Sequence, residues 1–514
     1  MSVPPEQIVY PLLGRARLHE IRRTNRAVAV PDEALLDLPE RAVQFGTGAF
    51  LRAFVDDFLQ RANEQGLFDG RIVAVGSTGS TRDHAMRCQD GLYTVAVQGI
   101  EHGHPVQQFR VLASVSRALS ALHDWDAVLE LARSPTLKFV FSNTTEVGIA
   151  LHPDDRMHDT PPRSFPAKLT RFLFERARAF EFEASCGVVV VPCELIENNG
   201  ARLRELTVAL SERWALGVRF MHWLDASVTF CNTLVDRIVP GTPRGEEAHR
   251  LAELLGYEDP LLTTCEPYRL FAIEGGAELR EMLPWTRADP CIRVVPDISP
   301  YRKRKVRLLN GAHTVLVAAA LEAGCETVGE AVTHPLLSRF VRRAMFEEIV
   351  PSLDADGATE FAEAVLERFR NPFIRHSLVD ITLQGTTKMR VRVVPSILAS
   401  AKRTQHAPRS LAFGFAAFLS FMRGGCRTAR LAQGLPMPAD DRADHLAGLW
   451  ADIPDGSANA IERLVLSVCG DQVLWGTDLT LVPEFVDVVT EYLLRIRDAG
   501  VEAALADHLA SGVT

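Results

Sequence analysis

The sequence predicts an α/β protein: an N-terminal domain built on a doubly wound parallel sheet, followed by a mainly α-helical C-terminal domain. Two observations support this. Between residues 40 and 295, short apolar strands alternate with helical segments, as in a parallel sheet with crossover helices. After the proline-containing stretch at 293–301 the pattern becomes mainly helical. We therefore expect a first domain over residues 1–297 and a second over 298–514.

The first domain contains a glycine-containing turn directly after its first strand. Gly46 and Gly48 stand in this turn and open a helical segment at 54–62. Glycines there allow close backbone approach to a pyrophosphate, and a helix N-terminus favours negative charge. Leu51 replaces the third glycine of the usual fingerprint. The turn predicts a Rossmann-type dinucleotide-binding domain, with strands expected near 42–45, 71–75, 138–142 and 187–192.

The end of the second expected strand bears on the choice of cofactor. NAD enzymes often place an acidic residue there for the ribose hydroxyls, but the segment 76–82 contains no Asp or Glu. Ser77, Thr78 and Arg82 can instead contact a 2′-phosphate. The residues therefore leave NADP open beside NAD.

The second domain is expected to consist of amphipathic and buried helices. Apolar residues recur there at helical spacing, and neither an internal repeat nor a low-complexity segment interrupts them. The expected helices cover 306–323, 336–349, 359–370, 411–423, 460–468 and 483–498.

The first of these helices contains a candidate catalytic set, Lys305, Asn310 and His313. At ~100° per residue, Asn310 lies ~140° and His313 ~80° around the axis from Lys305, so the side chains can converge on one pocket. A lysine in a partly apolar cleft can act as a base, and Asn and neutral His can donate hydrogen bonds to a developing alkoxide. The structural alternative is a solvated basic cluster at 301–305, a turn asparagine and a core histidine.

The spacing Lys-x4-Asn-x2-His resembles the signature of the polyol-specific long-chain dehydrogenases, the mannitol dehydrogenase family. A second segment is similar to that family's other signature, a strand running into Val235-Asp236-Arg237-Ile-Val-Pro240. The resemblance implies a metal-independent oxidoreductase that uses NAD. It also implies that Lys305 is the acid-base residue and that Asp236 lies near the substrate.

The same resemblance assigns further cofactor contacts. The family shows a Gly-x-Gly-x-Phe-x-Arg opening, which places Phe50 and Arg52 with the two glycines. Asn143 and Thr144 follow the third expected strand, and ligands of open α/β sheets bind at the carboxyl ends of strands. These two residues are expected near the nicotinamide ribose.

Two segments are similar to the hexuronate branch of the family, the tagaturonate reductases (altronate oxidoreductases). They are Ser142-Asn-Thr-Thr-Glu and Pro192-Cys-Glu-Leu-Ile-Glu-Asn-Asn199-Gly. The second departs from the Cys-Asp-Asn wording of mannitol dehydrogenases. Its Asn199 is expected to be the second amide of an oxyanion site, with Asn198 as a nearby competitor.

A sugar acid carries a carboxylate that mannitol lacks, so a basic residue near its binding end has a physical purpose. Arg375, Lys388 and Arg390 are candidates, with an exposed basic loop as the structural alternative. The resemblance thus predicts reversible reduction of D-tagaturonate to D-altronate. D-fructuronate or a mannitol/fructose-type substrate is the alternative within this chemistry, and a catalytically silent NAD(H)-binding regulator is the alternative outside it.

Composition excludes several other classes of function. The chain has 514 residues and a formal net charge of −9, which argues against nucleic-acid binding. It has no apolar run long enough for a membrane span, and its nine scattered cysteines favour a reducing cytoplasm. His102 and His104 form the only close histidine pair, without acidic or thiol partners at ligand spacing, so no metal site is expected. We expect a cytoplasmic monomer or small homo-oligomer acting on a small sugar acid.

Overall fold

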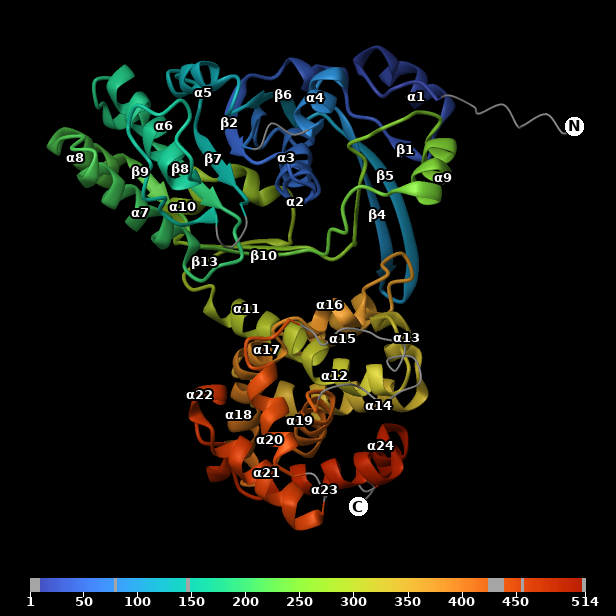
Figure 1. The fold of residues 1–514 in the computed structure, drawn as a ribbon. Coiled ribbons are helices and arrows are strands. Elements are labelled where there is room, and N and C mark those ends of the chain that lie inside the picture. Colours follow the sequence, from blue (N-terminus) through green and yellow to red (C-terminus); the bar gives the residue numbers. More distant parts are fainter. Residues whose placement is uncertain (1–9, 78–80, 145–147, 424–438, 454–456, 511–514) are drawn as a thin grey trace, which may run out of the picture. The chain divides into compact units, whose positions relative to one another are not determined.

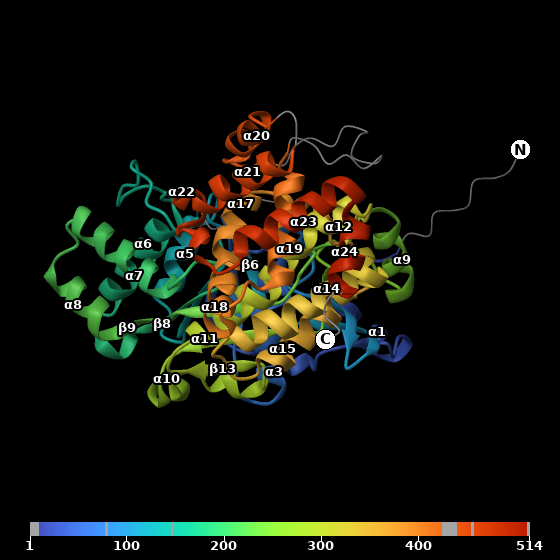
Figure 2. The same ribbon diagram turned by 90° about the horizontal axis from the view of Figure 1, so that it is seen from below.

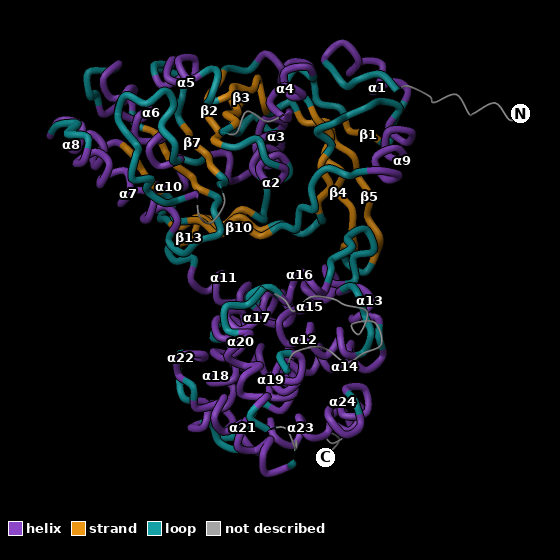
Figure 3. The backbone as a smooth tube through the Cα atoms, in the orientation of Figure 1, coloured by secondary structure: helices purple, strands orange, loops and turns teal. Residues whose placement is uncertain are grey.

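The computed structural model describes residues 10–77, 81–144, 148–423, 439–453 and 457–510, and Figure 1 traces them in chain order. The chain divides into two units, Met1–Ile298 and Ser299–Thr514, each with its own core. Strands gather in the first unit and helices fill the second, as the colours of Figure 3 show. The predicted combination of a Rossmann-type α/β domain and a mainly helical domain is confirmed.

The first unit is organised by a six-stranded parallel sheet. From β2 the chain adds β3 and β6 on one side, then returns to add β7, β8 and β9 on the other. This reversal makes the sheet doubly wound, and ligands of such sheets bind at the carboxyl ends of the strands flanking the switch point. In spatial order the strands are β6 Val115–Ser120, β3 Arg71–Gly76, β2 Glu40–Phe45, β7 Phe139–Ser142, β8 Val188–Pro192 and β9 Val228–Phe230.

Both faces of this sheet are covered. Val43 and Phe45 of β2 point to one face, where α5 (Trp125–Ala132) and α6 (Phe165–Ala179) pack. Ala42 points to the other face, against α3 (Val55–Glu64). Burial on both faces explains the uninterrupted apolar runs of the strands. The remaining helices of this unit are α1 Leu18–Thr24, α2 Ala49–Arg52, α4 Thr81–Cys88, α7 Asn199–Arg213, α8 Val218–Ser227, α9 Gly245–Leu255 and α10 Ala277–Met282.

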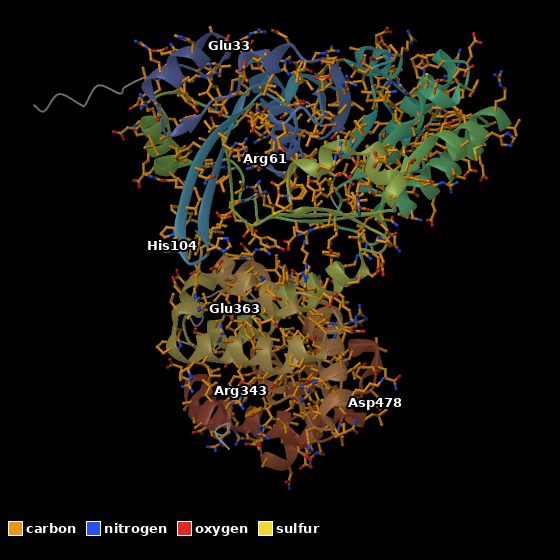
Figure 4. All side chains as sticks on the ribbon, turned by 180° about the vertical axis from the view of Figure 1, so that it is seen from behind. Glu33, Arg61, His104, Arg343, Glu363 and Asp478 are labelled. Atoms are coloured by element: carbon orange, nitrogen blue, oxygen red, sulfur yellow. The ribbon has the colours of Figure 1, made fainter. Side chains whose placement is uncertain are left out.

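Two smaller sheets complete the first unit. The sequence pattern did not predict them as separate sheets. One is built around a long antiparallel hairpin whose two-residue turn is formed by His102 and Gly103, with φ of 53° and 78°. Positive φ at both positions suits a hairpin turn, so the close histidine pair belongs to a turn, and Figure 4 labels His104 at this hairpin end. The orders are β1 (Val28–Ala29)-β5 (His104–Leu112)-β4 (Tyr93–Glu101)-β11 (Thr263–Cys265) and β10 (Thr233–Asp236)-β12 (Leu270–Glu274)-β13 (Ile292–Val295).

The second unit is a helical assembly around α12 (Gly311–Glu322) and α19 (Arg409–Phe421). Gly414 lets these two helices approach closely, because a Cβ there would lie 2.6 Å from Cγ1 of Val315. On its other side α19 packs against α23 (Phe485–Ala499), and Figure 2 shows α23 beside α19. The other helices are α11 Ser299–Arg304, α13 Val328–Thr333, α14 Pro335–Arg343, α15 Ala358–Phe369, α16 Leu378–Thr382, α17 Gly385–Lys388, α18 Val394–Thr404, α20 Ala443–Ala451, α21 Ala458–Gly470, α22 Gln472–Trp475 and α24 Val501–Ala510.

Three segments of the second unit are π-helical, a feature that the sequence pattern did not predict. They are η6 (Lys305–Asn310), η7 (Ala344–Ile349) and η9 (Met389–Val393), and each continues directly into or out of an α-helix. Single π-helical turns inside α-helices occur frequently at functional sites. Among the helices that the structure describes, none has the length and hydropathy needed to cross a bilayer.

Candidate active site

The glycine turn after β2 borders a cavity of about 680 Å³ at the carboxyl ends of the central strands. Gly46 has a φ of 133°, which favours glycine, and its amide donates to the Val75 carbonyl at 2.9 Å. Gly48 caps α2, and no atom lies within 4 Å of the position where a Cβ would stand. The turn therefore leaves room for a phosphate group to approach the backbone, and the cavity fits a dinucleotide.

Phe50 and Arg52 lie outside the described wall of this cavity, although the resemblance assigned them to the cofactor. The ring of Phe50 stacks on Phe54 at a centroid distance of 4.9 Å. Arg52 is buried and donates to the Thr47 carbonyl at 2.5 Å and to Oγ1 of Thr263 at 2.9 Å. Arg52 thus supports the glycine turn, and the expected contacts of Phe50 and Arg52 with the cofactor stay a prediction.

At the end of β3, Ser77 and Arg82 line the cavity, and Thr78 lies outside the described residues. The nearest acidic residue along the chain, Asp83, is buried and accepts a hydrogen bond from Oγ1 of Thr47 at 2.9 Å. Asp83 thus holds the glycine turn in place and is not among the described residues that line the cavity.

The beginning of α6 contributes cavity residues that the sequence analysis did not identify. Ser164 caps this helix by accepting a hydrogen bond from the Ala167 amide, and both Arg163 and Lys168 line the cavity. Nζ of Lys168 donates to the Arg163 carbonyl at 2.6 Å, and burial lowers the pKa of this lysine. The signal was present as a helix start, a serine followed by proline in the first turn.

The polar loop after β7 borders the same cavity, and a buried carboxylate holds it there. Asn143 and Thr144 both line the cavity, and the Asn143 amide donates to the Cys193 carbonyl at 2.7 Å. Glu194 accepts from the Thr144 backbone amide at 3.0 Å and from Oγ of Ser142 at 3.2 Å. Burial raises the pKa of Glu194, while these hydrogen bonds oppose the rise.

The two adjacent asparagines at the start of α7 differ in the exposure of their side chains. The side chain of Asn199 is fully buried, donating to Oγ1 of Thr233 at 2.9 Å and accepting from the Thr233 amide at 2.8 Å. Its Nδ2 also donates to the carbonyls of Pro192 and Glu194. These contacts give Asn199 a structural role, and its expected oxyanion role stays a prediction. Asn198 is exposed, with a φ of 51° at the N-cap of α7.

Asp236, the expected substrate contact of the first unit, is the last residue of β10 and is buried. The following residue, Arg237, anchors this strand end by an ion pair with Asp57 at 3.1 Å. Its Nε donates to the Glu266 carbonyl at 2.9 Å. The contacts of Arg237 thus fix the end of the strand on which Asp236 lies.

In the second unit, Lys305 and Asn310 are the first and last residues of η6. The Gly311 amide donates to the Val306 carbonyl, five residues earlier, as in a π-helix. Residues five apart lie closer to one face of such a helix than of an α-helix, which separates them by ~140°. The π-helical turn therefore brings Lys305 and Asn310 closer to one face than the sequence analysis expected.

His313 lies in α12, one turn after this segment, and is buried. Its ring stacks on Phe369 at 4.1 Å and meets His376 edge-on at 4.9 Å. Burial lowers the pKa of His313 well below its usual value, and the positive charges of Arg368, Arg392 and Lys388 lower it further. The imidazole is therefore neutral at physiological pH and can donate a hydrogen bond without supplying charge.

The basic residues expected to contact the substrate lie in different surroundings. Nζ of Lys388 donates to the Ile381 carbonyl at 2.9 Å, and burial lowers its pKa, as does the charge of Arg392. Arg375 extends away, with 81% of its side chain exposed and Nη2 on Glu326 at 3.0 Å. The charge of Lys388 thus acts on His313, whereas Arg375 belongs to a surface ion pair.

Comparison with known proteins places this chain among dehydrogenases. A family model described as the mannitol dehydrogenase Rossmann domain matches residues 40–287, and the mannitol dehydrogenase C-terminal domain matches residues 297–497. The altronate oxidoreductases of Pectobacterium atrosepticum and Yersinia enterocolitica are each 44% identical to this chain, over 91% of it and 97% of their own length.

Solved structures agree on the fold. Pseudomonas fluorescens mannitol 2-dehydrogenase, in a ternary complex with NAD and D-mannitol, has a TM-score of 0.70 and 24% identity, covering 97% of this chain and 99% of its own. A substrate-free D-sorbitol dehydrogenase has a TM-score of 0.76 and 22% identity, covering 96% of this chain and all of its own. The resemblance found in the sequence is confirmed, and the chain belongs to the mannitol dehydrogenase family.

Proposed function

We propose that this protein reversibly reduces the keto sugar acid D-tagaturonate to D-altronate with NADH. The observation that carries the proposal is the 44% identity to altronate oxidoreductases across nearly the whole length of both chains. The placement of Lys305 and Asn310 at the two ends of η6 and the cavity at the glycine turn support it.

The first unit would hold the dinucleotide. The backbone at Gly46 and Gly48 is open to the pyrophosphate, and Asn143 and Thr144 stand where polar contacts to the nicotinamide ribose are expected. When bound, NADH supplies the hydride that the keto carbon accepts. The residues of the cavity bind and orient; none of them needs to change its covalent state.

The second unit would provide the proton and the oxyanion contacts. As the keto carbon gains the hydride, its oxygen becomes an alkoxide, and Nζ of Lys305 gives this oxygen a proton that it later recovers from solvent. The Asn310 amide donates a hydrogen bond to the same oxygen, and neutral His313 positions the substrate. In the oxidative direction Lys305 accepts the proton. The second amide, expected from Asn199 with Asn198 as competitor, would come from the first unit, and we propose Asn198 because its side chain is exposed.

This set also separates the proposal from the regulator alternative. A protein that only senses NAD(H) has no need for an acid-base lysine paired with an amide on one helix face. We further place the enzyme in the cytoplasm as a monomer or small homo-oligomer. The eight cysteines within the described residues are all free thiols, in keeping with that compartment.

The deciding experiment measures loss of NADH absorbance with D-tagaturonate, D-fructuronate and D-fructose offered separately, and repeats each assay with NADPH. We expect the highest kcat/KM with D-tagaturonate and NADH. Preference for D-fructuronate would move the enzyme to the mannonate-forming reaction, and preference for D-fructose would move it to the polyol reaction. Binding of NADH without turnover of any ketose would favour the regulator.

A further inference from the structure

Two basic residues next to the catalytic helix are placed to recognise an anion. Lys388 ends α17 and Arg392 lies four residues later in η9, and side chains four residues apart lie close together on a helix surface. The positive charges of Lys388 and Arg392 both lower the pKa of His313. The charge of Arg392 also lowers the pKa of Lys388, after the larger effect of burial.

The backbone of η9 touches the segment that contains the catalytic residues. A Cβ on Gly311 would lie 3.3 Å from the carbonyl oxygen of Arg392, and Gly311 stands between Asn310 and His313 in the helical run. Arg392 is therefore fixed by close backbone contact at the level of the reaction centre. The residue is half-buried, and its charge lowers the pKa of His313.

Lys388 retains hydrogen-bonding capacity. Its ammonium group has three hydrogens, and one of them is donated to the Ile381 carbonyl at 2.9 Å. Within the part of the chain that the structure describes, no other acceptor takes the remaining two. A half-buried ammonium with open donors is suited to an anionic group of a ligand.

Two other basic residues of this region, Arg375 and Arg390, point elsewhere. Arg375 is 81% exposed and paired with Glu326. The side chain of Arg390 lies toward the loop after α22, with its Cδ 3.9 Å from the Cβ position of Gly476. The structure therefore separates Lys388 and Arg392 from Arg375 and Arg390, whereas the charge of buried Arg368 also lowers the pKa of His313.

We propose that Arg392, with Lys388 beside it, binds the carboxylate of the sugar acid and thereby selects acids over neutral ketoses. The proposal rests on the proposed function and names the residue that fits the protein to an acidic substrate. A planar guanidinium can bind a carboxylate through two parallel hydrogen bonds, whereas a primary hydroxyl offers no charge to match it. Arg392 is in this account a binding residue that takes no part in proton transfer.

The test compares Arg392→Met with the unaltered enzyme on two substrates. They are D-tagaturonate and D-tagatose, its counterpart with a hydroxymethyl group in place of the carboxylate. We expect KM for D-tagaturonate to rise about 100-fold, as when one partner of a buried charge pair is removed, while kcat/KM for D-tagatose stays within a factor of three or so. Arg392→Lys should restore part of the loss, and Arg375→Met is the matched control that should change neither substrate.

Each outcome is informative. Equal losses on both substrates would make Arg392 a structural residue and overturn the proposal, as would an unchanged KM for D-tagaturonate. Turnover of D-fructuronate in place of D-tagaturonate by the unaltered enzyme would contradict the proposed substrate only, and the same comparison would then use D-fructuronate and D-fructose. An unaltered enzyme that reduces no sugar acid would overturn both proposals.

Discussion

The backbone amide of Gly311 donates its hydrogen bond to the carbonyl of Val306, five residues earlier, and this single shift reshapes the proposed catalytic helix. It makes Lys305–Asn310 π-helical, so that the residues at the two ends of the segment lie closer to one face than they would in an α-helix. A regular α-helix of the same sequence would turn the amine and the amide well apart. The five-residue spacing between Lys305 and Asn310 thus suits a π-helix better than an α-helix.

Lys305→Ala should lower kcat by at least about 100-fold, because general acid-base catalysis by one residue contributes roughly 10²- to 10⁴-fold. The Kd for NADH should stay unchanged, since the cavity at the glycine turn lies in the other unit. Steady-state kinetics and NADH fluorescence titration measure the two quantities. Lys303→Ala, an exposed lysine two residues earlier, is the matched control. Undiminished turnover in Lys305→Ala would remove this lysine as the acid-base residue.

Gly311→Ala should reduce kcat more than it reduces stability. The added Cβ would stand 3.3 Å from the Arg392 carbonyl and 3.5 Å from that of Val306, so α12 and η9 must move apart by a few tenths of an ångström. We expect a loss of about tenfold or more in kcat, since small displacements of catalytic groups are costly. Gly329→Ala is the control, because a Cβ there meets its nearest atom at 3.9 Å. Equal kcat in both variants would show that this approach is not critical.

Glu194→Gln should weaken the nicotinamide end of the cofactor site without unfolding the sheet. One carboxylate oxygen accepts from the Thr144 amide and the other from Ser142, and glutamine offers only one acceptor oxygen. Loss of one charge-assisted hydrogen bond is worth about 1.5–3 kcal/mol, or about 10- to 100-fold in NADH affinity. Calorimetric titration with NADH and a thermal melt separate the two effects. A lower Tm with unchanged NADH affinity would assign Glu194 to stability alone.

Asn199→Ala and Asn198→Ala should fail in different ways. Removal of Asn199 leaves the buried amides of Gly200 and Thr233 without their acceptor, at a cost of about 1–3 kcal/mol for each. Denaturant unfolding should therefore show a large loss of stability for Asn199→Ala. Asn198→Ala should unfold like the unaltered protein but lose kcat by about 10²-fold, the usual effect of removing an oxyanion donor. The reverse pattern would return the oxyanion role to Asn199.

Acid should loosen the C-terminal helix through His508. Burial lowers the pKa of His508 to about 4 from its usual 6.5, and the neutral ring is hydrogen-bonded to Tyr492 at 2.8 Å and Ser410 at 3.2 Å. A base whose pKa is lowered by folding contributes stability that is complete above about pH 6.5 and is lost as the pH falls toward 4, by up to about 3 kcal/mol.

A series of thermal melts between pH 4 and 8 measures this loss. In His508→Gln the dependence of Tm on pH should flatten over that range, whereas His445→Gln, which alters an exposed histidine, should keep the original slope. An unchanged slope in His508→Gln would assign the acid sensitivity to other groups.

Much of the architecture could be predicted from the sequence, because it depends on the local pattern of apolar and polar residues. The apolar strands at 42–45 and 71–75 alternate between the two faces of the sheet, and the doubly wound fold follows from their repeated coupling to helices. The hairpin turn at His102 and Gly103 escaped prediction, because the dipeptide is a less common choice for positive φ than Asn-Gly.

The sequence by itself determined the fold class, the family and the identity of the titratable residues, since periodicity, glycine positions and motif spacing are properties of the chain alone. Tertiary structure decided which of those residues are engaged by contacts within the protein. Asn199 and Arg52 satisfy buried backbone and hydroxyl groups from distant strands, and Arg375 pairs with Glu326. Long-range hydrogen bonds and helix packing set these partners, and the linear spacing of residues carries no information about them.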